Sequence, residues 1–184
     1  MKNNGFLHLV SLVAALLLAL PATAQNESIV TLSGNAYITS GHTAFIDEDQ
    51  SAVRNWNDKE TVISFYFRTE KSGDMNIALQ AKGNSKIEVS LLGKKKKITL
   101  ESDELSRIEL GTFKVENPGY VKMDIRGLKI NQGTDFGSIA SVTVGGDVCP
   151  VLCVSQDFST HFGRRGPSVH LNYNLPDENI EWFY

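Results

Sequence analysis

Apolar and polar side chains alternate along several short stretches of this chain, and this period of two sets the narrowest limits on its fold. Because successive residues of a β-strand point to opposite faces, alternation places one set of side chains against a shared interior. In Thr61–Arg68, the side chains of Ile63, Phe65 and Phe67 share one face. Four further stretches repeat the pattern, with apolar members Met75, Ile77, Leu79 and Ala81; Ile87, Val89 and Leu91; Val121, Met123 and Ile125; and Ala140, Val142 and Val144. The pattern predicts strands with one buried face each.

Turn-forming residues separate these stretches. They are Lys71–Asp74, Lys82–Ser85, Asn117–Gly119 and Gly145–Asp147. Ser102–Leu105 could start one helical turn, and no longer helical pattern competes with the strands. Short strands at this spacing are typical of two stacked antiparallel sheets. We therefore expect an all-β protein, an antiparallel β-sandwich of the jelly-roll type.

One stretch breaks the alternation. Ile108 and Leu110 share one parity, whereas Phe113 and Val115 have the opposite parity. A β-bulge adds one residue to a strand and so restores the facing of the residues beyond it, and glycine is favoured there. The sequence therefore predicts a bulge at Gly111–Thr112.

Residues 1–24 have the features of a cleavable export signal. Lys2 supplies a positive start, Phe6–Leu20 is mostly apolar, and Ala22–Ala24 has the small side chains that a signal peptidase accepts. The uninterrupted apolar core, Leu12–Leu20, is shorter than the roughly 20 residues that cross a membrane. We expect an exported chain, periplasmic or extracellular, with no membrane span after signal cleavage.

The charge balance gives no support for a nucleic acid partner. The chain has 18 Lys and Arg against 21 Asp and Glu, a net charge of −3, whereas nucleic acid binding calls for a basic face. The basic run Lys94–Lys97 follows Gly93, where charges on a hairpin discourage pairing of sheet edges. Contact with an acidic polymer is the alternative for this run.

The sequence divides into three parts. The signal at 1–24 precedes a β-sandwich domain at 25–148, and 149–184 is too short for a core of its own. This last part contains the strand-like Ser168–Tyr173 and ends on the aromatic run Trp182–Tyr184, although chain termini are usually polar. We interpret 149–184 as a linker and the truncated start of a second domain.

Three groups of segments carry a resemblance to known families. They are Gly34–Thr39, Val53–Asp58 and Ile63–Arg68; Gly119–Gly127 and Ile139–Gly146; and Phe162–Tyr173 with Glu181–Tyr184. The first two groups resemble the domain of unknown function numbered 5077 (DUF5077), found in secreted bacterial proteins. The third resembles the opening of its companion domain, numbered 3472 (DUF3472). The resemblance implies a complete first domain followed by the truncated start of a second domain. Neither family has an activity that could be inferred for this chain.

The second group is also loosely similar to the last two strands of galactose-binding-like sandwiches, which include several carbohydrate-binding modules. In those sandwiches a glycine-tyrosine strand leads into a final strand that ends in glycine. This similarity concerns the fold, and a fold alone does not give a function.

Four aromatic residues are candidate sugar-binding side chains: Tyr37, Trp56, Tyr66 and Tyr120. Aromatic rings can stack on the apolar faces of sugars, while neighbouring amides and carboxylates bind the hydroxyls. Tyr66 and Tyr120 have the outward parity of their strands, and the other two lie in stretches rich in Asn and Asp. The alternative is that Trp56 plugs the open end of the sandwich and that the tyrosines are ordinary, half-buried strand residues.

Two arginines are further candidates for ligand binding. Arg164 and Arg165 could clamp an acidic sugar or a phosphate through bidentate hydrogen bonds. The alternative is a pair of salt bridges within their own domain, to Asp157 or Glu178.

The loop at 47–49 is a weak candidate for a structural calcium site. Asp47 and Asp49 offer the hard oxygen ligands that Ca²⁺ prefers. The loop lacks the spaced acids and the glycine of an EF-hand, so a solvated acidic turn is the favoured interpretation. No other cofactor is expected.

The two cysteines, Cys149 and Cys153, stand four positions apart. In an exported chain they can oxidise, so we expect a disulfide between them, although so small a loop gains little stability. Zinc is disfavoured because His161 and His170 do not have the spacing of a finger.

No catalytic set is recognisable. The chain has no nucleophile elbow, its histidines are scattered, and a carboxylate pair cannot be chosen without geometry. The leading hypothesis is a non-catalytic exported module that binds a polysaccharide or other glycan within a larger secreted protein. One alternative is an interaction domain that docks on its companion C-terminal domain. Another is a fragment of a polysaccharide-processing hydrolase.

Overall fold

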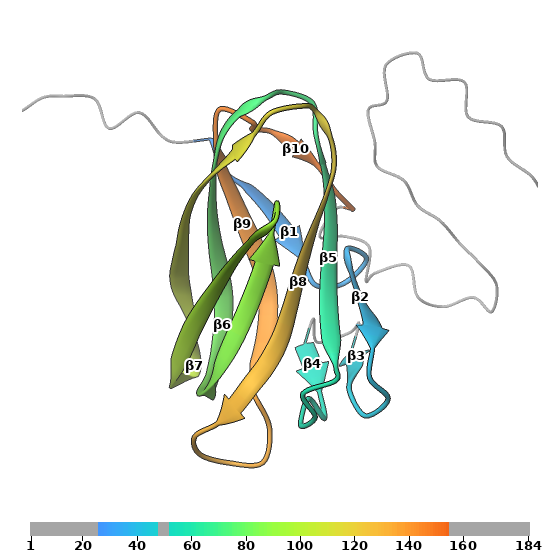
Figure 1. Ribbon diagram of the computed structural model, residues 1–184, viewed down its shortest axis with the longest axis vertical. Coiled ribbons are helices and arrows are strands. Elements are labelled where there is room, and N and C mark those ends of the chain that lie inside the picture. Colours follow the sequence, from blue (N-terminus) through green and yellow to red (C-terminus); the bar gives the residue numbers. More distant parts are fainter. Residues whose placement is uncertain (1–25, 48–51, 155–184) are drawn as a thin grey trace, which may run out of the picture.

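The computed structural model describes residues 26–47 and 52–154, which form ten β-strands (Figure 1). The strands are β1 (Ser28–Thr31), β2 (Ala36–Ser40), β3 (Phe45–Asp47), β4 (Ala52–Arg54), β5 (Val62–Thr69), β6 (Gly73–Leu91), β7 (Lys94–Val115), β8 (Gly119–Ile130), β9 (Ser138–Gly146) and β10 (Val151–Leu152). Across these two described ranges there is no helix, so the all-β prediction is confirmed. Ser102–Leu105, the stretch that could have started one helical turn, belongs to β7.

All strand pairs are antiparallel, and one long strand joins the two layers of the sandwich. The order in the main sheet is β1-β9-β6-β8-β5-β10, with β2 added to β5 and β7 added to β6, while β3 and β4 form a separate hairpin. The first part of β6, Met75–Lys82, pairs with β9, and its second part, Ser85–Leu91, pairs with β8. β6 therefore passes from one layer into the other, and β7 follows it along its length (Figure 1).

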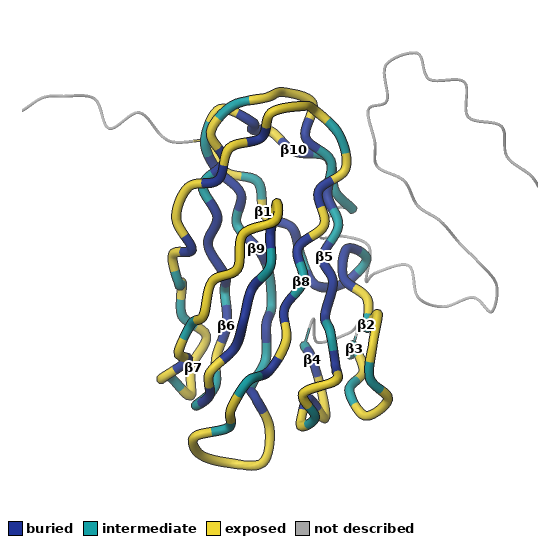
Figure 2. The backbone as a smooth tube through the Cα atoms, viewed as in Figure 1, coloured by how far each residue is buried: buried dark blue, intermediate teal, exposed yellow. Residues whose placement is uncertain are grey.

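The core lies between the layers and follows the predicted alternation. Figure 2 shows buried and exposed positions taking turns along β8, where Val121, Met123 and Ile125 are buried. The apolar members predicted on β5 and β6 are also buried. On β9, Val142 and Val144 are buried, whereas Ala140 is half-buried. The antiparallel β-sandwich prediction is confirmed.

The predicted bulge in β7 is present, one residue earlier than expected. Ile77 pairs with Gly111 and Ala78 pairs with Glu109, so Leu110 is the extra residue. Gly111 has a φ of 92°, a backbone conformation that favours glycine. As a result Leu110 and Phe113 are both buried despite their opposite parities.

A second irregularity lies where β6 passes between the layers. Ala81 pairs with Ser106 and Gly83 pairs with Ser102, so three residues of β7 stand opposite Lys82 alone. The backbone of the loop after β8 crosses closely here. A Cβ on Gly137, whose φ is 112°, would lie 2.0 Å from the carbonyl oxygen of Lys82, so no other residue fits without displacing the backbone.

The last described strand extends the sandwich beyond residue 148. β10 pairs with the end of β5, and Cys149 and Val151 belong to the hydrophobic core. The predicted export signal at 1–24 lies outside the described residues, as does nearly all of the predicted second domain. In the described part of the chain, no helix is long and apolar enough to span a membrane.

Candidate functional site

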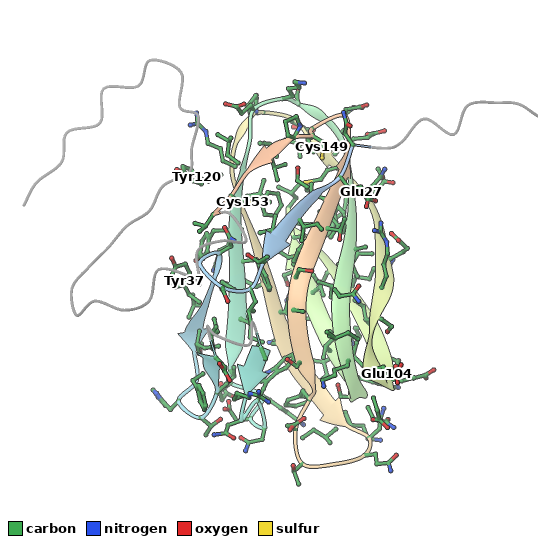
Figure 3. All side chains as sticks on the ribbon, turned by 180° about the vertical axis from the view of Figure 1, so that it is seen from behind. Glu27, Tyr37, Glu104, Tyr120, Cys149 and Cys153 are labelled. Carbon is green, nitrogen blue, oxygen red and sulfur yellow. The ribbon has the colours of Figure 1, made fainter. Side chains whose placement is uncertain are left out.

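Three of the four predicted sugar-binding aromatics share the outer face of β2, β5 and β8. We call this surface the tyrosine face, formed by Tyr37, Tyr66, Tyr120 and Arg68. Register brings them together, because Tyr37 pairs with Ser64 in β5 while Arg68 pairs with Tyr120 in β8. Tyr37 is 57% exposed and Tyr120 is 77% exposed, and Tyr66 is half-buried. Figure 3 shows Tyr37 and Tyr120 on the same side of the sandwich.

Neighbouring side chains support the rings of the tyrosine face. The rings of Tyr37 and Tyr66 meet edge to face, with centroids 6.0 Å apart and an interplanar angle of 62°. The guanidinium of Arg68 lies 5.9 Å from the ring centroid of Tyr120, within the range of a cation–π contact. Because the residues stand on paired strands, their backbone positions are fixed before any ligand arrives.

A row of polar side chains lies beside these rings. Ser64 Oγ donates to Asp124 Oδ1 over 2.6 Å, and Lys122 Nζ lies 3.1 Å from the same oxygen. Thr39 Oγ1 shares a hydrogen bond of 2.6 Å with Ser64 Oγ. The hydrogen bond to Asp124 raises the pKa of Lys122. The row thus offers both donors and acceptors next to the rings.

Trp56 does not belong to this surface, which contradicts the prediction that its ring meets a ligand. The side chain is 0% exposed and packs against Phe136, with ring centroids 5.3 Å apart. Its indole Nε1–H has no hydrogen-bond partner among the described residues. The alternative interpretation applies instead: the ring closes one end of the sandwich. Its polar neighbours Asn55 and Asn57 suggested that the ring is exposed. The sequence around Trp56 does not indicate its contact with Phe136, which is distant in the chain.

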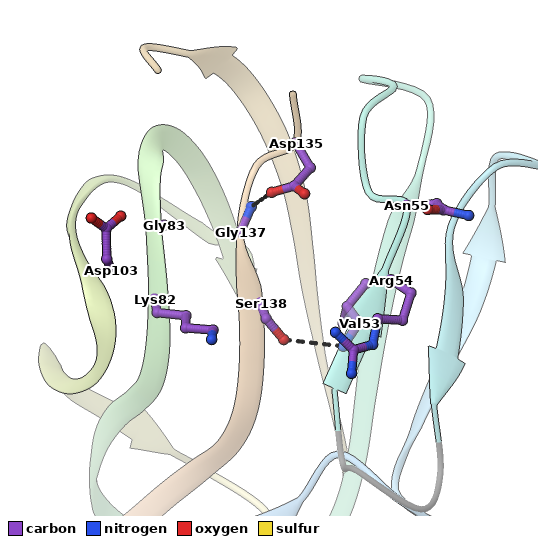
Figure 4. A pocket seen from close by; sticks show the side chains of 9 residues that line it. All are labelled: Val53, Arg54, Asn55, Lys82, Gly83, Asp103, Asp135, Gly137 and Ser138. Carbon is purple, nitrogen blue, oxygen red and sulfur yellow. Dashed lines mark hydrogen bonds between the residues drawn. The ribbon is translucent and has the colours of Figure 1, made fainter. Parts of the chain in front are cut away.

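A pocket of about 460 Å³, which the sequence did not predict, lies where β6 passes between the layers (Figure 4). Its lining comes from four separate segments: Val53, Arg54 and Asn55; Lys82 and Gly83; Asp103; and Asp135, Gly137 and Ser138. None of these segments contains a recognisable motif. The pocket exists because the fold gathers segments that are distant in the sequence.

Hydrogen bonds hold the walls of this pocket. The backbone N–H of Val53 donates to Ser138 Oγ over 3.2 Å, which ties β4 to the start of β9. The backbone N–H of Gly137 donates to Asp135 Oδ1 over 3.0 Å. Arg54 Nε donates to Asp47 Oδ2 over 3.3 Å, at the edge of the β3–β4 hairpin. The walls therefore carry cationic, anionic and neutral polar groups together.

Of the charged candidates from the sequence, Asp47 is the one that lies among the described residues. Asp47 is the ion-pair partner of Arg54, while Asp49, Arg164 and Arg165 lie outside the described residues. Within 26–47 and 52–154, no group of three or more His, Cys, Asp or Glu side chains could hold a metal ion.

The predicted disulfide between Cys149 and Cys153 is wrong for this structure, in which both thiols are free. The Cys149 thiol donates to the carbonyl oxygen of Val144 over 3.0 Å. The Cys153 thiol lies 3.7 Å from the carbonyl oxygen of Ile29. The short strand β10 separates the two residues and directs their side chains to different partners. Burial raises the pKa of the Cys153 thiol.

Several solved structures are similar to this chain. A Podospora anserina GH26-CBM35 beta-(1,4)-mannanase is similar with a TM-score of 0.50 and 11% identity, over 66% of this chain and 28% of the mannanase. The CBM36-1 domain of a multidomain xylanase from the hindgut metagenome of Trinervitermes trinervoides has a TM-score of 0.48 and 12% identity, over 66% of this chain and 98% of that domain. A family 35 carbohydrate binding module from Clostridium thermocellum has a TM-score of 0.47 and 10% identity, over 65% of this chain and 98% of that module.

At these identities the structural similarity concerns the fold alone. The chain spans little more than a quarter of the mannanase, 28% of its length. No curated protein matches the sequence. Residues 30–149 match the family described as Domain of unknown function (DUF5077), over the part of the chain that forms the sandwich. The chain belongs to the DUF5077 family.

Proposed function

We propose that this protein is a non-catalytic carbohydrate-binding module that binds a polysaccharide along the tyrosine face. One observation carries the proposal: Tyr37 and Tyr120 are 57% and 77% exposed on hydrogen-bonded strands of one sheet face. Large aromatic side chains at exposed positions leave apolar surface in water, and a cluster of them marks a binding surface.

The physical basis is stacking combined with hydrogen bonding. A sugar ring presents apolar C–H groups on its faces and hydroxyls at its edge. The three tyrosine rings can cover the faces, while Lys122 and Asp124 supply a donor and an acceptor for the hydroxyls. Because the strands already hold these groups in place, binding costs little conformational entropy.

The proposal includes export, since an extracellular or periplasmic module meets polysaccharides there. The features of residues 1–24 support it. The fold shared with the GH26-CBM35 mannanase, whose name includes a carbohydrate-binding module, is consistent with the same function.

Affinity electrophoresis against a panel of soluble plant and microbial polysaccharides tests the proposal. The double variant Tyr37→Ala/Tyr120→Ala should lower affinity for the retained polymer about thirtyfold, because each of the two lost aromatic contacts is worth roughly 1 kcal/mol. Phe45→Ala is the matched control, because Phe45 is an exposed aromatic residue (51%) on β3 and does not belong to the tyrosine face. Absence of retention by every polymer, or equal losses in both variants, would refute the proposal.

A docking function is the second candidate, favoured by one contact. Val154, the last described residue, is held by the side chain of Asn35, two residues before Tyr37. Val154 therefore lies near the tyrosine face, and a companion domain that follows it could cover this face. In that case the double tyrosine variant would increase protease cleavage beyond Val154 and leave polysaccharide retention unchanged.

A further inference from the structure

We propose that the pocket between β4, the crossing of β6 and the start of β9 is a second binding site, which takes a single unit of a neutral sugar. Its ligand class rests on the proposed function, whereas its location and chemistry are independent of the tyrosine face. The volume of about 460 Å³ falls within the range of small-molecule sites, roughly 300–1,000 Å³.

The irregularity of β7 builds one wall of the pocket. Three residues of β7 stand opposite Lys82, and Asp103 is the first of them. A regular ladder would place one residue there, so the extra chain length carries Asp103 out of the pairing register and into the pocket lining. Figure 4 shows Asp103 and Lys82 on one side and Arg54 on the other.

The floor of the pocket is backbone. Gly83 and Gly137 cross so closely that a Cβ on Gly83 would lie 2.6 Å from the carbonyl oxygen of Phe136. Both glycines line the pocket, and neither contributes a side chain to it. A ligand can therefore approach the peptide groups directly.

The charges of the lining balance. Arg54 and Lys82 are cationic, Asp103 and Asp135 are anionic, and Arg54 also pairs with Asp47. A strongly anionic ligand would meet the two carboxylates, and a strongly cationic ligand would meet the two cations. Electrostatics therefore favours a ligand without net charge.

The mixture of donors and acceptors favours a polyhydroxylated ligand. Each sugar hydroxyl both donates and accepts, so it needs partners of both kinds at short range. The two carboxylates accept hydrogen bonds, Arg54 and Lys82 donate, and Asn55 does both. Because none of the nine lining residues is aromatic, recognition depends on hydroxyl positions and not on stacking. Selectivity in the pocket therefore depends on the stereochemistry of the sugar hydroxyls.

The test is an NMR titration of the ¹⁵N-labelled protein with glucose, mannose, galactose and xylose, each added separately. At least one sugar should shift the backbone amides of Lys82, Gly83, Gly137 and Ser138 and leave those of the tyrosine face unchanged. Asp103→Asn and Lys82→Met should each weaken this response about tenfold, as expected for loss of a charged hydrogen-bond partner. Glu104→Gln and Lys86→Met are matched controls, because both residues are exposed nearby and line no part of the pocket.

The outcomes separate this inference from the proposed function. Shifts confined to the tyrosine face, a response to CaCl₂ but to no sugar, or equal affinity in Asp103→Asn would overturn the pocket site. None of these results would contradict polysaccharide binding by the tyrosine face, which the affinity gels test separately. Conversely, the pocket amides could still shift in Tyr37→Ala/Tyr120→Ala while the unchanged protein is retained by no polymer. This result would support sugar binding in the pocket and refute polysaccharide binding by the tyrosine face. The spectra also report whether each variant is folded.

Discussion

The side-chain amide of Asn35 pairs with the backbone of Val154 as a neighbouring strand would. Asn35 Nδ2 donates to the Val154 carbonyl oxygen over 3.1 Å, and the Val154 N–H donates to Asn35 Oδ1 over 2.7 Å. The same Nδ2 donates to the carbonyl oxygen of Thr31 over 3.1 Å, and Asn35 is only 3% exposed. One buried side chain therefore ties the end of the described chain to the turn between β1 and β2.

Replacing this residue should loosen the end of the sandwich. Asn35→Ala leaves backbone groups of Thr31 and Val154 without their partner, which should lower the free energy of unfolding by about 1–3 kcal/mol in urea titration. Limited proteolysis should show faster cleavage next to Val154. Asn57→Ala, at an exposed position, should change neither measurement. Equal stability of the two variants would contradict the role of Asn35.

Gly127 has no room for a methyl group. A Cβ there would lie 2.3 Å from Phe136 Cε2, in the ring that packs on Trp56. Gly127→Ala should therefore lower the free energy of unfolding by about 1–3 kcal/mol through overpacking. Gly145→Ala is the matched control, because its nearest neighbour, Glu27 Cγ, would be 3.5 Å away, an ordinary contact. Similar thermal midpoints for both variants would show that Phe136 moves aside freely.

Trp56 should matter for stability and not for polysaccharide binding. Trp56→Ala removes a ring that is 0% exposed, and such truncations cost about 3–5 kcal/mol. Measured below its lowered melting temperature, the variant should be retained by polysaccharide gels like the unchanged protein. Selective loss of retention in a fully folded Trp56→Ala protein would instead restore Trp56 as a ligand contact.

Acid should destabilise the loop around Asp58. Hydrogen bonds from Thr43 Oγ1 and from Thr61 Oγ1 and N–H hold the pKa of Asp58 below its ordinary value. Because the folded-state pKa is lower than the unfolded one, the stabilisation is fully present above the unfolded value of about 4 and is lost as pH falls through the folded value. Urea titrations from pH 6 to pH 2 should show this loss, and Asp58→Asn should flatten it. An identical pH profile for the variant would assign the acid sensitivity to other carboxylates.

Both cysteines should be recovered as thiols. The Cys149 thiol is buried against Val144, and the raised pKa of Cys153 reduces its thiolate fraction, so native alkylation at pH 8 should be slow. After unfolding without a reductant, iodoacetamide should modify both residues, as mass spectrometry would show. Modification only after reduction would establish the disulfide that the structure lacks.

The sequence predicted those features that depend on local alternation. The inward facing of Ile63, Phe65 and Phe67 on β5 was predictable because side-chain direction repeats every two residues. The bulge before Phe113 was predictable from the parity change, although its position was one residue off, because either neighbour of Gly111 can supply the extra residue. The shared surface of Tyr66 and Tyr120 follows from the same outward parity once the strands pair.

Features that depend on contacts between distant segments were not predictable. Trp56 lies outside any strand, so no parity indicated its direction, and Phe136, which packs against it, is 80 positions further along the chain. The pocket has the same origin, since Arg54, Asp103 and Asp135 meet only after β6 has crossed between the layers. The disulfide prediction was wrong because the spacing of Cys149 and Cys153 does not indicate that the strand β10 lies between them.

The crossing of Gly83 over Gly137 separates the parts of the pocket that can change from those that cannot. A side chain at 137 would collide with the carbonyl oxygen of Lys82, so the floor is invariant for as long as the sandwich closes in this way. The positions of Arg54, Lys82 and Asp103 carry no such restriction, because their side chains are exposed. Evolution or an engineer can therefore exchange these three residues to redirect selectivity while the architecture beneath them stays intact.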